Sequence, residues 1–207
     1  MRYLYAVGSL LLAMLLPGTV LAQKFPDHPV RLILPYAAGG SFDVIGRSIA
    51  QKFQEQTGQP LVVDNRGGAA GLIASDLVAK APPDGYMVLL ASAAQVTIAP
   101  AIQTTMSYDP LNDLVPITYA LQTSNVLFVG NDFPARTAQE LVAMAQAKPE
   151  AITYASSGNG SVSHLAGELF AQRLNIKLLH VPYKGAAPAL TDLASGRVSL
   201  IFTTLAS

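Results

Sequence analysis

The sequence predicts an α/β protein with two similar lobes that face each other across a cleft. Short apolar runs alternate with amphipathic segments along the chain, which is the pattern of buried strands and of the helices that cover them. In each half of the chain, one such strand is followed by a glycine-rich turn and then by a helix. Because this strand–turn–helix unit occurs twice, we expect one lobe in each half.

Composition and charge indicate an ordinary globular chain. Hydrophobic residues make up 51% of the 207 positions and charged residues make up 13%. Lys and Arg number 13, Asp and Glu also number 13, and no run of like charge occurs, which argues against a nucleic-acid partner. The absence of cysteine excludes disulfides, thiolate metal sites and cysteine nucleophiles.

Residues 1–22 have the pattern of a secretory signal peptide. Arg2 supplies the positive start, residues 4–16 form the apolar run, and Pro17-Gly18 precedes a small-residue cleavage site that ends at Ala22. The apolar run is shorter than the roughly 20 residues that a membrane-spanning helix needs, which disfavours a transmembrane anchor. We therefore expect cleavage after Ala22 and export of a soluble protein.

The first strand–turn–helix unit begins with the apolar residues 30–34, which read as a strand buried on both faces of a parallel sheet. Gly39-Gly40 forms the turn, and Gly58 stands where the helix ends. The apolar positions expected on one face of this helix are Phe42, Ile45, Ile49 and Phe53. Bare N–H groups at such a turn favour an anion site, although glycines there can also serve turn geometry alone. We interpret the loop as a carboxylate cradle.

Two more strands are expected in the first lobe, at residues 61–64 and 86–90, with a helix at residues 72–79 between them. The run Gly67-Gly68-x-x-Gly71 resembles half of a dinucleotide fingerprint but lacks the G-x-G-x-x-G spacing. We interpret it as close packing of a helix on a strand. The small-residue loop at residues 91–95 lies at the carboxyl end of a strand, where open α/β sheets bind ligands.

The boundary between the lobes is predicted from a change in the sequence pattern after Pro100. Two apolar runs, at residues 115–121 and 125–129, are placed at the crossover between the lobes. Lobe 1 is then residues 23–122 and lobe 2 is residues 123–207.

The second lobe repeats the plan of the first. A helix running to about Ala147 is predicted to begin with a capping box formed by Thr137 and Glu140. A strand at residues 152–155 leads to the glycine turn at residues 156–160 and to a helix that Ser161 caps. The apolar face of that helix is expected at Val162, Leu165, Ala166, Leu169 and Phe170. The remaining elements are strands at residues 178–181 and 198–203, and a helix at residues 187–194 that Gly196 ends.

Two glycine loops that face each other across a cleft are suited to a carboxylate. A helix N-terminus stabilises a carboxylate by about 0.3–1 kcal/mol, and by up to about 2 kcal/mol when the site is partly buried. Each charge-assisted hydrogen bond contributes about 1.5–3 kcal/mol more. Several such bonds are enough for a micromolar complex without an arginine.

Four motifs, together with the predicted signal peptide, carry a resemblance to a known family. They are Pro35-Tyr36-Ala37-Ala38-Gly39-Gly40-Ser41-Phe42-Asp43 with Arg47, Pro82-Pro83-Asp84-Gly85-Tyr86, Tyr154-x-Ser156-x-Gly158-x-Gly160-Ser161-x-x-His164-Leu165-Ala166, and Val181-Pro182-Tyr183-Lys184-Gly185 followed by Asp192-Leu193 and Gly196. The chain resembles the periplasmic solute receptors of tripartite tricarboxylate transporters, often called Bug-type receptors. The match covers essentially the whole mature chain.

The resemblance implies a two-lobed fold of the periplasmic-binding-protein type (type II) that closes over a small carboxylate. A di- or tricarboxylate, an amino acid or an aromatic acid all fit this class. The implied partner is the set of membrane permease subunits, and the implied location is the periplasm. We expect a monomer with no cofactor, no metal and no nucleic-acid partner.

The implied binding residues come from both loops. The resemblance places ligand contacts, partly through ordered water, on Tyr36, Ala38, Gly39, Ser41 and Asp43 in the first loop and on Ser157, Gly158, Gly160, Ser161 and His164 in the second. Asp43 is expected to order water rather than to touch an anion. The residues expected to line the rest of the cleft and to set selectivity are Ser92, Gln95, Tyr183 and Thr203.

The chain departs from the family at its C-terminus, because family members continue beyond the position of Ser207 and return to complete the first lobe. The two-lobed fold is therefore expected to be incomplete, with an exposed apolar face and weakened ligand binding. The alternative function is a small-acid-processing α/β enzyme, such as a hydrolase that uses Ser161 and His164. No G-x-S-x-G nucleophile elbow occurs, and the three histidines lack metal-ligand spacing, so the sequence favours the receptor.

Overall fold

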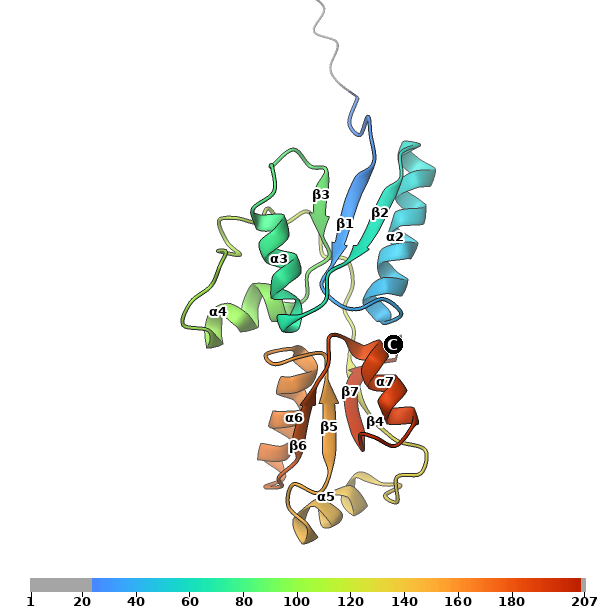
Figure 1. The fold of residues 1–207 in the computed structure, drawn as a ribbon, viewed down its shortest axis with the longest axis vertical. Helices are drawn as coiled ribbons and strands as arrows, with labels where there is room; N and C mark the ends of the chain where they lie inside the picture. Colours follow the sequence, from blue (N-terminus) through green and yellow to red (C-terminus); the bar gives the residue numbers. More distant parts are fainter. Residues whose placement is uncertain (1–23, 206–207) are drawn as a thin grey trace, which may run out of the picture.

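The computed structural model describes residues 24–205, which form two lobes stacked end to end (Figure 1). The signal peptide predicted at residues 1–22 lies outside the described residues. Each lobe contains one sheet with helices packed against it, so the predicted α/β class is confirmed. No helix within the described part of the chain is long and apolar enough to cross a membrane.

Lobe 1 is built on a sheet of three parallel strands in the order β2-β1-β3. The strands are β1 (Val30–Leu34), β2 (Leu61–Asn65) and β3 (Met87–Leu89). The helices and helical turns of this lobe are α2 (Ser41–Thr57), η1 (Ala69–Gly71), α3 (Leu72–Ala79), η2 (Ala94–Ile98) and α4 (Ala99–Ile102). Strand β3 is shorter than predicted and only half-buried, whereas the centre of β1 is fully buried, as expected for the middle strand.

The helix α2 contacts the sheet through a glycine rather than through the whole predicted apolar stripe. A Cβ on Gly46 would lie 2.9 Å from Leu34 Cδ1, so the absence of a side chain lets the helix approach the strand closely. This contact rotates the helix, and Ile49, which was predicted to face the core, is 36% exposed. Gly58 ends the helix in the left-handed conformation, as predicted.

Lobe 2 contains a four-stranded sheet in the order β4-β7-β5-β6, in which only the pairing of β4 with β7 is antiparallel. The strands are β4 (Asn125–Val129), β5 (Thr153–Ser156), β6 (Leu179–Pro182) and β7 (Leu200–Thr204). The helices are α5 (Ala138–Ala147), α6 (Val162–Arg173) and α7 (Ala186–Ala194).

The helix boundaries of lobe 2 follow the predicted capping signals. Thr137 and Glu140 form the capping box of α5, and Ser161 caps α6 by accepting from the His164 N–H. The predicted apolar face of α6 is wrong at two positions, because Val162 is 37% exposed and Leu169 is 52% exposed. The cause is again a glycine: Gly167 packs directly on Tyr154, and a Cβ there would lie 2.3 Å from the ring.

The segment between α4 and β4 contains no helix or strand. Its apolar side chains lie in solvent: Leu111 and Val115 are each 87% exposed, Tyr119 is 78% exposed and Ile117 is 76% exposed. The run at residues 115–121 forms part of the connection between the lobes, as predicted, whereas the run at residues 125–129 is strand β4 of lobe 2 rather than part of the crossover.

Candidate ligand-binding site at the lobe junction

Each glycine loop lies at the junction of the lobes and contacts a different partner there. In the first loop, the Ala37 N–H of lobe 1 donates to the Lys184 carbonyl of lobe 2, with an N···O distance of 3.1 Å, and a Cβ on Gly39 would lie 3.5 Å from Ala187 Cβ at the start of α7. In the second loop, a Cβ on Gly158 would lie 3.1 Å from the Ala70 nitrogen of lobe 1. The N-terminus of α2 therefore faces the start of α7, and the N-terminus of α6 reaches the same junction beside residues 67–71 (Figure 1).

The first loop leaves several main-chain donors available. Gly39 N–H donates to Asp43 Oδ2 at 3.1 Å, and Arg47 forms an ion pair with the same carboxylate. Arg47, and then the Gly39 N–H, hold the pKa of Asp43 below its usual value against the opposing effect of burial. Asp43 thus stabilises the conformation of the loop through its hydrogen bond to the main chain. The N–H groups with no hydrogen-bond partner among the described residues are those of Ala38, Gly40, Ser41 and Phe42.

The second loop satisfies most of its own N–H groups. Four of the five residues predicted to bind ligand donate internally: Ser157 to Ser163 Oγ, Gly158 to Ser156 Oγ, Gly160 to His164 Nδ1 and Ser161 to the Gly158 carbonyl. The fifth, His164, donates its own N–H to Ser161 Oγ. The donors without a partner in the described chain are Asn159, Val162 and Ser163, and the last two form the first turn of α6. The N–H groups without a partner therefore lie beside the residues predicted to bind ligand rather than at them.

Ser161 and His164 do not form a nucleophile–base pair. Ser161 Oγ shares a hydrogen bond with Ser163 Oγ at 3.0 Å and accepts from the His164 N–H, and the side chain is 1% exposed. His164 Nδ1 accepts from Gly160 instead of facing the Ser161 hydroxyl. The geometry gives no support to the hydrolase alternative.

A third loop, residues 67–71, also reaches the junction, and the sequence analysis missed its role. Ala69 and Ala70 have φ values of 46° and 52°, a left-handed conformation that costs non-glycine residues about 1–2 kcal/mol each. Gln95 Nε2 donates to the Ala70 carbonyl at 2.5 Å and holds this turn. Only Gly71 fits the predicted helix–strand packing, because a Cβ on Gly67 would instead lie 2.8 Å from the Lys184 carbonyl of lobe 2. The N–H groups of Ala69 and Ala70 have no partner among the described residues, whereas the Gly71 N–H donates to the Gly68 carbonyl.

Tyr36, Ser92 and Gln95 form one network inside lobe 1. Gln95 is fully buried, and its Oε1 accepts from the Ser92 N–H at 2.6 Å while its Nε2 also donates to Tyr36 Oη at 3.2 Å. Tyr36 Oη lies 3.0 Å from Ser92 Oγ, and burial raises the pKa of this tyrosine. Both atoms of the Gln95 amide are occupied by hydrogen bonds within lobe 1. Gln95 therefore positions the loops and has no amide donor or acceptor left for a ligand.

The two remaining predicted residues lie in lobe 2. Tyr183 donates its hydroxyl to Asp192 Oδ2 at 2.7 Å, and burial, with the neighbouring carboxylate, raises the pKa of Tyr183 to about 12. Its carbonyl, rather than its hydroxyl, lies near Gly158. Thr203 is 6% exposed in β7. These contacts do not place the hydroxyl of Tyr183 or of Thr203 as a hydrogen-bond donor at the glycine loops.

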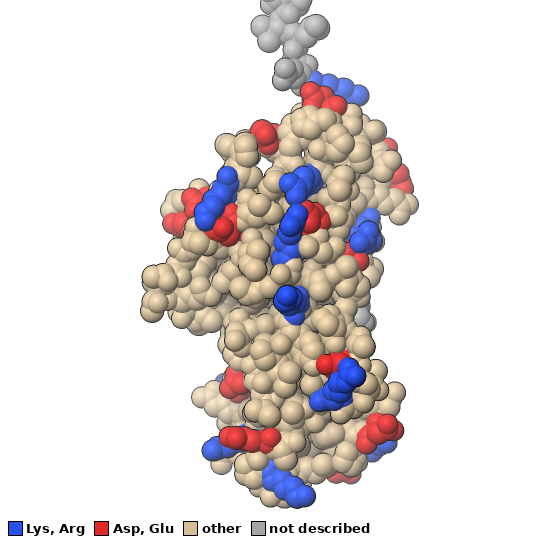
Figure 2. Space-filling view, in the orientation of Figure 1, with Lys and Arg blue, Asp and Glu red and all other residues tan. Residues whose placement is uncertain are grey.

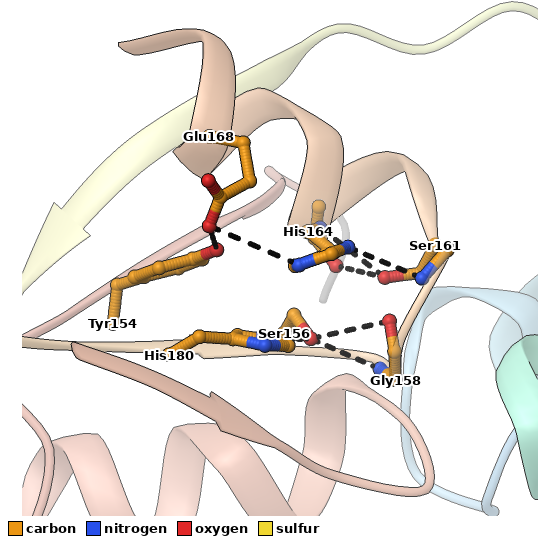
Figure 3. A network of polar contacts seen from close by, with 9 residues as sticks. Tyr154, Ser156, Gly158, Ser161, His164, Glu168 and His180 are labelled. Carbon is orange, nitrogen blue, oxygen red and sulfur yellow. Dashed lines mark hydrogen bonds and ion pairs between the residues drawn. The ribbon is translucent and has the colours of Figure 1, made fainter. Parts of the chain in front are cut away.

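Behind the second loop, three rings form a stack (Figure 3). The ring centroids of His164 and His180 are 4.2 Å apart, and those of His180 and Tyr154 are 4.8 Å apart. Tyr154 donates its hydroxyl to Glu168, and this burial and hydrogen bond raise the pKa of the tyrosine. Burial, with His164 beside it, lowers the pKa of His180 from 6.5 to about 4.

The lowered pKa of His180 predicts that acid destabilises the fold between pH 6.5 and about pH 4. In this window the unfolded chain takes up a proton at residue 180 and the folded chain does not, so the free energy of unfolding falls as the pH falls. Because the ring is partly exposed, we expect a loss of about 1–2 kcal/mol rather than the full value of about 3 kcal/mol. Urea unfolding near pH 7 and near pH 4 measures it, and His180→Gln serves as the comparison. An equal loss in both proteins would contradict the prediction.

Charged side chains are mixed over the surface. On the face shown in Figure 2, Lys and Arg groups lie beside Asp and Glu groups in both lobes. Several of these are ion pairs, such as Arg66 with Asp64 and Arg197 with Asp192. Within residues 24–205, no group of three or more His, Asp or Glu side chains is arranged to hold a metal ion.

Comparison with known proteins identifies the family. A family model described as "Tripartite tricarboxylate transporter family receptor" matches residues 45–207. The chain belongs to this receptor family. It is 40% identical over 185 residues to a protein of the tcbD–tcbE intergenic region of Pseudomonas sp. strain P51, and the match covers 89% of this chain and 55% of that protein.

Solved structures of similar proteins share the fold of this receptor chain. R. palustris Rpa4515, solved with adipate, is 37% identical with a TM-score of 0.85, covering 88% of this chain and 61% of that one. MatC from Rhodopseudomonas palustris, solved with bound malate, is 28% identical with a TM-score of 0.82, covering 87% and 61% of the two chains. The chain thus spans little more than half the length of the proteins it matches, and the resemblance read from the sequence motifs is confirmed.

Proposed function

We propose that this chain is the ligand-capturing part of an extracytoplasmic solute receptor, which binds a small carboxylate and delivers it to the membrane permease subunits of a tripartite tricarboxylate-type transporter. One observation carries the proposal: the N-termini of α2 and α6, from different lobes, both lie at the lobe junction and carry N–H groups with no partner among the described residues. Family membership supports it. The receptor acts as a monomer in the periplasm, after export by the predicted signal peptide.

The carboxylate lies between the two helix N-termini. One oxygen accepts from the N–H groups of Ser41 and Phe42, and the other accepts from those of Val162 and Ser163, directly or through water. The unpartnered N–H groups of Ala69 and Ala70 supply further donors from lobe 1. Adipate and malate, bound by two structural neighbours, are both carboxylates, which supports this ligand class.

A thermal-shift screen tests the proposal. The mature chain from Gln23 is heated with adipate, malate and other small organic acids, and the melting temperature is compared with that of the free protein. A ligand that binds only the folded state stabilises it by about 2.7 kcal/mol at a hundredfold excess over its dissociation constant, so a clear upward shift is expected.

Matched neutral analogues, in which an amide replaces each carboxylate, serve as controls. They are expected to give no shift, because a neutral group gains little at a helix N-terminus. A cooperative melting transition that no acid moves would contradict the proposed function. Hydrolysis of an ester or amide substrate that Ser161→Ala abolishes would replace it with the enzyme alternative.

A further inference from the structure

The second loop is held at each end by an imidazole. At its start, His180 Nε2 lies 2.6 Å from Ser156 Oγ. At its end, His164 Nδ1 accepts from the Gly160 N–H at 3.2 Å. The two rings come from different elements, His164 from α6 and His180 from β6, and they stack on each other behind the loop (Figure 3).

The hydrogen bonds fix the protonation of one imidazole. Ser156 Oγ accepts from the Gly158 N–H at 3.1 Å, lies 2.6 Å from His180 Nε2 and donates to the Gly158 carbonyl at 3.3 Å, so this hydroxyl pairs with His180 whether or not Nε2 carries a proton. His164 Nδ1 accepts from a main-chain N–H and therefore carries no proton. A proton on His164 Nδ1 would place two donors against each other.

The charged and titratable groups around the two imidazoles are Tyr154 and Glu168. The rings face Tyr154 of β5 and Glu168 of α6, and the Tyr154 hydroxyl is already donated to Glu168. The Glu168 carboxylate lies 3.9 Å from His164 Nε2. Burial, and then the adjacent His164 ring, oppose a proton on His180, while the Glu168 charge favours one.

We propose that His164 is a positioning residue that holds the second loop in its ligand-binding shape only while its Nδ1 carries no proton, so that the receptor loses its carboxylate on acidification. The inference rests on the proposed function and specifies how that same site is regulated. Acid breaks the Gly160 contact, the loop moves, and the first turn of α6 no longer presents its N–H groups at the junction.

The test is the dissociation constant of the acid that gives the largest thermal shift, measured by calorimetry between about pH 8 and about pH 5, the range in which imidazoles titrate. The affinity of the unaltered protein is expected to fall about tenfold, the equivalent of one lost hydrogen bond. In His164→Asn, Oδ1 replaces Nδ1 as acceptor and cannot take up a proton. This variant is expected to have the same affinity near pH 5 as near pH 8.

Two further variants complete the design. His180→Gln replaces the neighbouring ring, which stays neutral between about pH 8 and about pH 5, and is expected to retain the pH dependence. His28→Asn, which changes an exposed histidine of lobe 1, is also expected to retain it. Titration of the ligand itself affects all proteins equally, so the difference between them isolates the imidazole of His164. Equal pH dependence in the unaltered protein and in His164→Asn would overturn the inference.

A measurement on the unaltered protein gives an independent answer. The amide proton shift of Gly160 in NMR spectra is expected to move as the hydrogen bond to His164 is lost in acid. A Gly160 shift that stays constant through the imidazole titration would overturn the inference. If no acid binds near pH 8, the proposed function itself fails; binding near pH 8 with a flat profile removes only the role of His164.

Discussion

Val162→Pro is expected to weaken carboxylate binding about 10- to 100-fold. Val162 is the first residue of α6, and its N–H has no partner among the described residues. Proline removes that N–H, and a charge-assisted hydrogen bond of about 1.5–3 kcal/mol corresponds to this loss of affinity. The change suits the backbone, because proline is favoured at the first helical position and Ser161 has φ −71° and ψ 161°. Calorimetric titration measures the effect.

The matched control is Ala138→Pro, which makes the same change at the first residue of α5. Thr137, which precedes it, is also extended, with φ −129° and ψ 157°, and α5 lies at the end of lobe 2 away from the junction (Figure 1). Normal binding by Ala138→Pro together with weak binding by Val162→Pro supports a direct contact. Equal affinities in both variants would show that the α6 N-terminus does not bind the ligand.

Gly67→Ala is expected to lower ligand affinity tenfold or more by keeping the lobes apart. The new Cβ would lie 2.8 Å from the Lys184 carbonyl, a main-chain atom of lobe 2 that cannot move aside like a flexible side chain. Fewer molecules then hold the two lobes in contact as they are in this structure. The apparent affinity for the ligand falls in proportion to the fraction of molecules that do. Calorimetry reports the affinity, and small-angle X-ray scattering reports an increase in the radius of gyration.

Gly58→Ala separates closure from simple destabilisation. Gly58 has φ 76°, so alanine is strained there by about 1 kcal/mol, yet its Cβ would contact nothing within 4 Å. We expect a lower melting temperature for this variant with unchanged ligand affinity and unchanged scattering. An unaltered affinity in Gly67→Ala would mean that the lobes tolerate the extra methyl group and that this contact does not control closure.

Local signals in the sequence predicted the element boundaries well because their physics is local. The capping box at Thr137 and Glu140, the cap at Ser161 and the helix end at Gly58 depend only on neighbouring residues. The packing faces of α2 and α6 were predicted less well. Apolar periodicity counts side chains, whereas these helices contact their sheets through Gly46 and Gly167, which have none.

The candidate site could be located from the sequence but not resolved into individual donors. Two glycine loops before helices were predicted to form the site, and both lie at the lobe junction. The choice of free N–H groups depends on which side chains accept the others, and Ser156, Ser163 and His164 take up donors that the pattern left open. The loop at residues 67–71 was missed because its contact with Lys184 joins residues far apart in the chain.

The chain passes from one sheet to the other only once within the described residues, through the extended segment between Ile102 and Asn125. Such a tether fixes how far the lobes can separate, but it does not align them, so bringing them together costs conformational entropy. Alignment then depends on the few main-chain contacts at the junction, such as that of Ala37 with Lys184. A ligand that bridges the lobes would therefore act as a second link between them, and shortening or stiffening the tether would make its capture easier.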